Sequence, residues 1–142
     1  MTFLVERLAE LRRQLDHRSA VRPRVSASES LQRDFSLRND VRFPLLSICQ
    51  LVIGIAGELA ARRGDRFENY PEAVRTLASD QRFTAHLVRR LECLPGSCNV
   101  IVHEYVALDL GRVVQALDEL DDVREFARIV AGIERGSPDP SR

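Results

Sequence analysis

The segment that most constrains the fold of this chain is the long apolar stretch "FPLLSICQLVIGIAGELAA" at residues 43–61. Ser47, Gln50 and Glu58 interrupt it, so its unbroken apolar pieces are shorter than the roughly 20 residues of a membrane span. We therefore expect a buried helix and no membrane contact. Apolar residues lie on nearly all sides of this helix. In a domain this small, that pattern indicates that part of the helix meets another subunit.

Helical periodicity continues on both sides of this stretch. Leucines at residues 4, 8, 11 and 15 form one apolar stripe, which predicts a first helix of roughly four turns. A polar connector follows, and a helix is expected to restart near residues 29–35 with Ser26 or Ser28 as its cap. The long helix is expected at about residues 39–63, or from nearer Arg42 because Pro44 disfavours a helix interior, and it ends at Gly64.

Three further helices are expected in the second half of the chain. Pro71 suits the first position of a short helix at residues 71–79, and another covers residues 81–92. Asp109 can cap the last helix. The apolar stripe of that helix contains Val113, Leu117, Leu120, Val123, Phe126 or Ala127, Val130 and Ile133.

The chain of 142 residues suits one domain, and neither a repeat nor the alternation of a strand stands out. We predict an all-α bundle of five or six helices at residues 1–135 and a disordered tail at 136–142. The net charge is zero, which excludes a bulk attraction to nucleic acid, although all 21 cations are Arg. Three cysteines give no disulfide framework, and this count fits a reducing cytosol.

The segment "SCNVIVHEY" at residues 97–105 places His103 and Tyr105 after an aliphatic run, and several interpretations are open. The two side chains can simply pack at the edge of a core. A zinc site of Cys93, Cys98 and His103 is disfavoured, because a five-residue spacing turns helical neighbours about 140° apart. A histidine can instead act as an acid–base group in RNA cleavage, where the 2′-OH is the nucleophile and neither a metal nor a cofactor is needed.

The longer sequence "LPGSCNVIVHEYVALDLGRVVQAL" resembles the signature of the HepT-like branch of the HEPN superfamily. The family pattern is an Arg, four residues, a His, any residue and a Tyr, followed by an Asp that opens the last helix. His103, Tyr105 and Asp109 fall into this frame. "LLSICQLVIGIAGELAARRG" is similar to the long helix of the family and "NYPEAVRTLA" to its next short helix, so the resemblance covers about residues 3 to 134.

This resemblance implies an antiparallel helical bundle that dimerises through the long helix and has its motif at the dimer cleft. It implies a metal-independent endoribonuclease, the toxin of a toxin–antitoxin pair, whose antitoxin is an MntA-like nucleotidyltransferase that silences it by attaching AMP. A higher assembly with the antitoxin stays open. By position, His103 is the acid–base residue, Asn99 supports the site, and Tyr105 accepts AMP or contacts RNA.

The sequence departs from the family at the motif Arg, because Cys98 stands in its place. A thiol cannot replace a guanidinium at a phosphate. Many relatives also have an Asp where this chain has Gly54. Arg42, Arg89 or Arg90 are candidates to supply the missing cation. The alternatives are a degenerate module that dimerises and binds the nucleotidyltransferase without cutting RNA, and a redox-sensitive protein that works through Cys98.

Overall fold

The computed structural model describes residues 2–25, 33–94, 116–118 and 120–136, and the account below concerns these residues. They form five α-helices and two short 3-10 helices, which agrees with the predicted all-α class. The α-helices are α1 (Thr2–Val21), α3 (Phe35–Arg63), α4 (Tyr70–Arg75), α5 (Ala85–Leu91) and α8 (Asp121–Gly136), and the 3-10 helices are η1 (Arg22–Arg24) and η2 (Thr76–Ser79).

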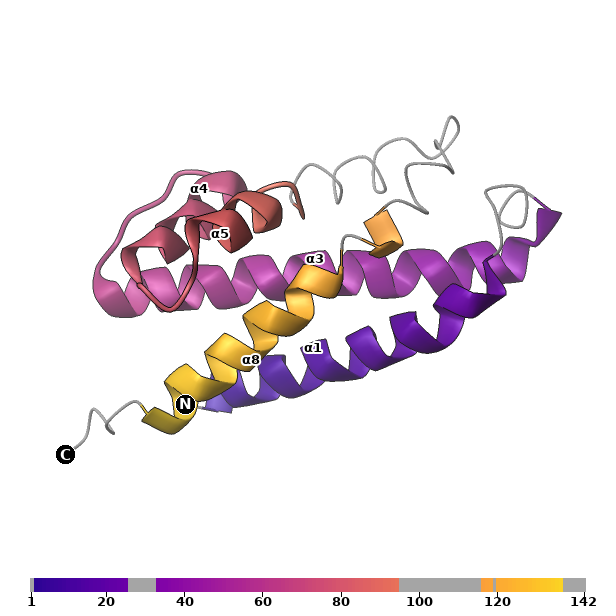
Figure 1. Ribbon diagram of the computed structural model, residues 1–142, viewed down its shortest axis with the longest axis horizontal. Helices are drawn as coiled ribbons and strands as arrows, with labels where there is room; N and C mark the ends of the chain where they lie inside the picture. Colours follow the sequence, from indigo (N-terminus) through magenta and orange to yellow (C-terminus); the bar gives the residue numbers. More distant parts are fainter. Residues whose placement is uncertain (1, 26–32, 95–115, 119, 137–142) are drawn as a thin grey trace.

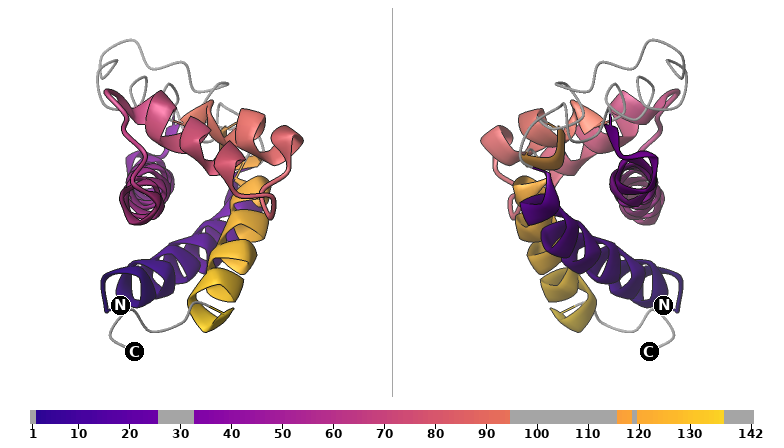
Figure 2. Two further views of the ribbon diagram at one scale, coloured as in Figure 1. Left: turned by 90° about the vertical axis from the view of Figure 1, so that its left-hand side faces the viewer. Right: turned by 90° about the vertical axis from the view of Figure 1, so that its right-hand side faces the viewer.

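The two longest helices, α1 and α3, run antiparallel to one another as the base of the bundle (Figure 1). The predicted leucine stripe of α1 is confirmed, because all four of its leucines are at most 6% exposed. Figure 2 looks almost along α3, with α1 and α8 together below it and α4 and α5 above it. Burial of this one stripe therefore joins α1 to both α3 and α8.

The long helix α3 begins earlier than predicted, at Phe35 rather than near Asn39. Its start is set by Asp34, whose side chain accepts a hydrogen bond from the backbone N–H of Leu37 at 3.0 Å. Pro44 consequently lies inside the helix, where its missing N–H is offset by burial of the ring. Gly64 ends the helix as predicted, with a φ of 78° that favours glycine.

The central part of α3 is apolar enough and long enough to cross a membrane, with a mean hydropathy of 1.8 over its best window. However, 56% of that window is buried against the rest of the protein. Ile48, Val52 and Ile55 are completely covered. The same composition is typical of the core helix of a bundle, and the packing agrees with the predicted buried helix.

The short helices between α3 and the motif segment are broken more often than predicted. Asn69, rather than Pro71, marks the start of α4, since its side chain accepts the N–H of Glu72 at 2.9 Å. The predicted helix at residues 71–79 is divided into α4 and η2. The predicted helix at residues 81–92 is shorter in the structure and corresponds to α5. Thr84 caps this helix by accepting a hydrogen bond from the N–H of Leu87, and in the turn before it Asp80 accepts one from the N–H of Arg82.

The last helix, α8, packs on α1 and α5 through its predicted apolar stripe, which is buried from Leu117 to Ile133. The ring of Phe126 lies 5.9 Å from that of Phe83, centroid to centroid. The helix is not continuous from Asp109 onward, because a turn at Leu120 precedes its first residue, Asp121. Its last residue is Gly136, one position beyond the predicted domain end. Asp109, Ser26, Ser28 and residues 137–142 lie outside the described part of the chain.

Candidate functional site

The four predicted site residues all belong to one segment that lies outside the described residues. Cys98, Asn99, His103 and Tyr105 fall within residues 95–115. The structure therefore defines the surroundings of the predicted site through the two ends of that segment. Both ends are anchored in the hydrophobic core, and the second is also held by charged groups.

The upstream end follows α5 and is fixed by apolar burial. Leu91 and Leu94 are 1% and 3% exposed, and both belong to the main core cluster. Between them, Cys93 is exposed, and its thiol lies 3.7 Å from the carbonyl oxygen of Arg89. Leu94 is therefore buried immediately before residues 95–115, which contain the motif.

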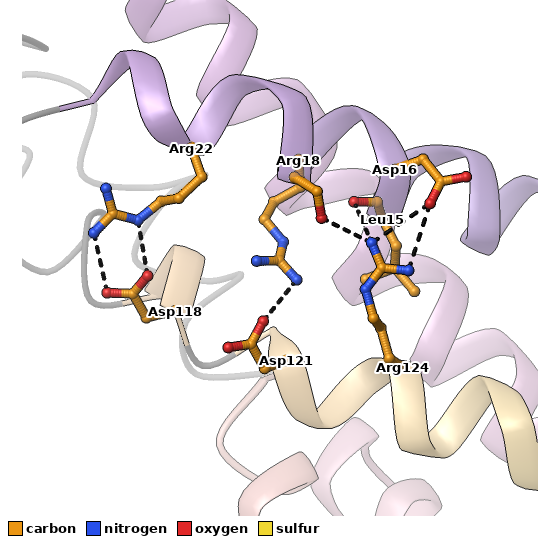
Figure 3. Close-up of polar contacts among 8 residues, drawn as sticks. Leu15, Asp16, Arg18, Arg22, Asp118, Asp121 and Arg124 are labelled. Atoms are coloured by element: carbon orange, nitrogen blue, oxygen red, sulfur yellow. Dashed lines mark hydrogen bonds and ion pairs between the residues drawn. The ribbon is translucent and has the colours of Figure 1, made fainter.

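At the downstream end, Ala116 and Leu117 are buried in the core, at 4% and 0% exposed. The next residue, Asp118, is held by a bidentate ion pair with Arg22, the first residue of η1, which directly follows α1 (Figure 3). Arg22 Nε donates to Asp118 Oδ1 at 2.8 Å and Arg22 Nη2 to Asp118 Oδ2 at 3.2 Å. Its Nη1 also donates to the carbonyl of Val25 at 2.7 Å. A fork of this kind fixes both position and orientation of the carboxylate.

Two more arginines continue this contact between α1 and the start of α8, as Figure 3 shows. Arg18 is 5% exposed, and its Nη2 lies 2.9 Å from Asp121 Oδ1. Arg124 reaches back from α8 and donates to Ser19 Oγ at 2.7 Å and to the carbonyl of Leu15 at 3.3 Å. We call Arg18, Arg22, Arg124 and their partners the arginine clamp. It ties the exit of the motif segment to α1.

The clamp was not foreseen from the sequence. Its members lie about a hundred positions apart, and each is one of many arginines or aspartates with no local signature. Arg18 near the end of α1 and Arg22 at the start of η1 are four positions apart, a spacing that puts two residues on the same side of a helix, and this is the only signal available in the sequence. Only the packing of α1 on α8 turns that side toward Asp118 and Asp121.

The ion pair with Arg22 lowers the pKa of the Asp118 carboxyl, mainly through their hydrogen bonds. A carboxyl whose pKa is depressed in the folded state stabilises the fold above its unfolded pKa, and the effect is lost as the pH falls through the folded value. We expect Asp118→Asn to lower the free energy of unfolding at pH 7 by about 0.5 kcal/mol, since the 59% exposed carboxylate is screened by water. Urea unfolding across pH measures this difference.

The difference between Asp118→Asn and wild type is expected to shrink only below the ordinary pKa of 3.8, and to vanish under the folded value. Glu6→Gln is the control, since Glu6 makes no ion pair with another described residue. A loss of stability that is equally large in acid and at neutral pH would contradict this role of the charge.

The three arginines that were candidates to replace the motif cation have different surroundings in the structure. Arg90 is engaged, because its Nε lies against Asp122 of α8. Arg42 is half-buried and already interacts with neighbouring groups. Arg89 is exposed and has no ion pair with another described residue. Of the three, Arg89 is therefore the side chain most available to a ligand.

Two other predicted features can be compared with the described residues. A Cβ atom at Gly54 meets nothing within 4 Å, so the fold leaves room for the acidic residue that relatives carry there. Among the described residues, no three His, Cys, Asp or Glu side chains come together as metal ligands. Two members of the disfavoured zinc set, Cys98 and His103, lie outside the described residues.

Comparison with known families and structures gives a consistent result. The family model described as "Ribonuclease HepT-like" matches residues 5–130. A tri-AMPylated HEPN toxin from Shewanella oneidensis, solved in complex with an MNT antitoxin, is 22% identical and has a TM-score of 0.80 over 93% of this chain and 98% of its own. No curated protein matches the sequence.

Two further solved structures have the same fold. A toxin–antitoxin complex with AMP-PNP is 21% identical, with a TM-score of 0.78 over 92% of this chain and 98% of the other. A mutant of the toxin–antitoxin pair MntA-HpeT is 22% identical, with a TM-score of 0.79 over 93% and 99% of the two chains. At these identities the likeness concerns the fold, and each solved chain is covered almost completely.

Proposed function

The chain belongs to the HepT-like ribonuclease family, and on this premise we propose that it is the toxin of a toxin–antitoxin pair and cleaves RNA at His103. One observation carries the proposal. The family model spans residues 5–130, and within that span His103, Tyr105 and Asp109 keep the order and spacing of the family motif. The solved relatives include HEPN toxins, which supports the same reading.

The chemistry requires little from the protein beyond a positioned proton acceptor. The imidazole of His103 removes the proton of a ribose 2′-OH, and the 2′ oxygen bonds to the adjacent phosphorus. The bond from phosphorus to the 5′ oxygen then breaks, and that oxygen takes up a proton. Asn99, four residues before His103, supports the site by hydrogen bonding. No metal or cofactor takes part in these steps.

The proposed partner is a nucleotidyltransferase antitoxin of the MNT kind. Its support is that one similar structure is an AMPylated HEPN toxin in complex with an MNT antitoxin, and that others are toxin–antitoxin complexes. In this chain the acceptor is Tyr105. Its phenol oxygen bonds to the α-phosphorus of ATP, pyrophosphate leaves, and the phenol proton is released. The attached AMP brings a negative charge to the site and repels the RNA backbone.

We also propose that two copies of the chain form a homodimer through α3. This dimer can assemble further with the antitoxin in the cytosol. The support is that Phe35 and Phe43 of α3 are 70% and 65% exposed, although rings of this size are usually covered. Burial of two such rings against a second copy removes apolar surface from water. Light scattering that gives the mass of a single chain at working concentrations would contradict the dimer.

A second function is favoured by one residue, Cys98. A site without its guanidinium lacks the group that binds the phosphate and stabilises its charge in the transition state. The chain then serves as a binding or assembly module that forms the dimer and the antitoxin complex without cutting RNA. A redox role for Cys98 is the third reading. Retention of antitoxin binding in Cys98→Ser would count against that role.

The proposed ribonuclease is tested by incubating RNA in EDTA with the toxin purified away from its antitoxin. Wild type is expected to cleave weakly. His103→Ala is expected to lose cleavage altogether, because the proton acceptor is gone. His17→Ala is the matched control, since His17 is an exposed histidine on α1 and lies outside the motif. Equal cleavage by wild type and His103→Ala would assign the activity to a contaminant and refute the mechanism.

A further inference from the structure

A shallow hollow on the surface of α8 is lined mainly by arginines, which are three of its five described lining residues. Its lining residues are Arg82, Arg128, Ile129, Gly132 and Arg135. Arg82 comes from the turn before α5, and the other residues belong to α8, from its middle to its end. Among the described residues no carboxylate lines this hollow, although acidic residues are as numerous as basic ones in the whole chain.

The helical period explains how the hollow forms. Gly132 lies one turn after Arg128 and one turn before Arg135, so the three residues share one side of α8. Gly132 has no side chain, and a Cβ atom placed there meets nothing within 4 Å. The guanidinium groups of its two neighbours therefore flank an open floor of backbone, and Arg82 approaches the same floor from the neighbouring turn.

The charges at the hollow are only partly compensated by neighbouring carboxylates. Arg82 is paired with Asp80 through two contacts of 3.0 and 2.8 Å, and Arg128 is paired with Glu125 on its own helix. Arg135 is exposed and has no ion pair with another described residue. The three cations and two carboxylates leave one positive charge, and both paired side chains stay more than half exposed.

We propose that this hollow binds backbone phosphates of RNA outside the catalytic segment. Guanidinium groups bind phosphate oxygens through paired hydrogen bonds, and such contacts provide most of the sequence-independent affinity for nucleic acid. The inference rests on the proposed action on RNA and extends the footprint of that substrate. Gly132 lies twelve residues after Leu120, or roughly 18 Å along the chain's last helix. A strand bound there reaches well beyond the exit of the motif segment.

The composition of the hollow favours phosphate over an acidic protein surface. Stable protein interfaces are centred on large apolar or aromatic side chains. Ile129 is the only apolar side chain in the lining, and it is 8% exposed. The exposed aromatic residues of the described chain lie on other elements, in α1, α3 and the region around α4. The hollow thus offers charge and hydrogen-bond donors without an apolar anchor.

The test measures binding of a fluorescent oligouridylate to the full-length chain by anisotropy, in the His103→Ala background, so that the RNA stays intact. Arg128→Gln is expected to weaken binding several-fold at low salt. It should also reduce the slope of log K against log salt by about 0.7, the contribution of one phosphate on a single strand. Arg13→Gln is the matched control, because Arg13 on α1 has the same exposure and the same pairing with a glutamate three residues earlier.

A second variant blocks the hollow without removing any arginine. Gly132→Glu places a carboxylate between Arg128 and Arg135, where it can pair with both, and the open space means that the fold accommodates it. It should weaken RNA binding at least as much as Arg128→Gln, and Gly132→Ala should not weaken it. Circular dichroism confirms that each variant is folded.

The possible results separate this inference from the proposed nuclease. RNA binding that depends on Arg128 and Gly132, together with no RNA cleavage by the chain that keeps His103, supports the phosphate site and refutes the nuclease. Absence of RNA binding by the parent chain, or equal effects of Arg13→Gln and Arg128→Gln, overturns the phosphate site. The phosphate site is also overturned if the α8 variants lose binding to the nucleotidyltransferase but keep binding to RNA. That result would assign the hollow to an acidic protein partner.

Discussion

Cys98→Arg is expected to raise the rate of RNA cleavage by about a hundred- to a thousandfold over the natural chain. The new guanidinium occupies the position of the motif cation, five residues before His103. There it can hold the scissile phosphate and stabilise the charge that develops on its oxygens, which a neutral thiol cannot do. Cleavage is measured in EDTA with the antitoxin removed.

The double variant Cys98→Arg with His103→Ala is the control, and it should be inactive despite its restored cation. Cys98→Lys tests whether the planar guanidinium is needed or a positive charge is enough. A smaller gain in cleavage rate is expected, because an ammonium cannot bind two phosphate oxygens in parallel. No gain from Cys98→Arg in a chain that already cleaves would contradict the phosphate role of this position. The search would then turn to Arg89, the most available of the candidate cations.

Phe126→Ala is expected to lower the free energy of unfolding by about 3–5 kcal/mol, the largest effect on stability that we predict. Phe126 is completely buried and packs against Phe83, with ring centroids 5.9 Å apart. Truncation leaves a cavity between α8 and the turn before α5, and rigid helices can close such a cavity only in part. Urea unfolding followed by circular dichroism at 222 nm measures the loss.

Two controls show whether the loss comes from the cavity. Phe126→Leu keeps most of the buried volume and should cost much less. Phe3→Ala truncates a ring that is 37% exposed and has Arg7 stacked over it, so it should cost less than 1 kcal/mol. A loss below about 1 kcal/mol for Phe126→Ala would show that α8 does not depend on this contact.

Most of the fold could be predicted because burial follows the period of the helix. The leucines of α1 and the stripe of α8 repeat at 3.6-residue spacing, and both patterns are buried as expected. The long apolar segment could also be assigned to the core from the polar residues that interrupt it, although its mean hydropathy alone would suit a membrane span. These patterns are local, so one sequence is sufficient to read them.

The helix boundaries were less accurate, because two or more residues competed for each role. Asp34 caps α3 where Asn39 was expected to begin it, and Asn69 rather than Pro71 marks the start of α4. A helix cap depends on which side chain can reach a free backbone N–H. The stabilisation that neighbouring capping residues offer differs by less than the energy of helix packing, so packing decides between them. The expected effect of Pro44 on the start of α3 was also too large, since the helix begins well before this proline and contains it.

The sequence alone determined the helical class, the buried faces and the family motif, because each of these is written in the spacing of residues along the chain. The tertiary structure decided what the charged residues do. Arg22 pairs with Asp118 at a separation of 96 positions, and Arg82 meets Arg128 and Arg135 around Gly132. Contacts of this kind depend on how helices are placed against one another, and a pattern along one helix carries no information about its neighbour's orientation.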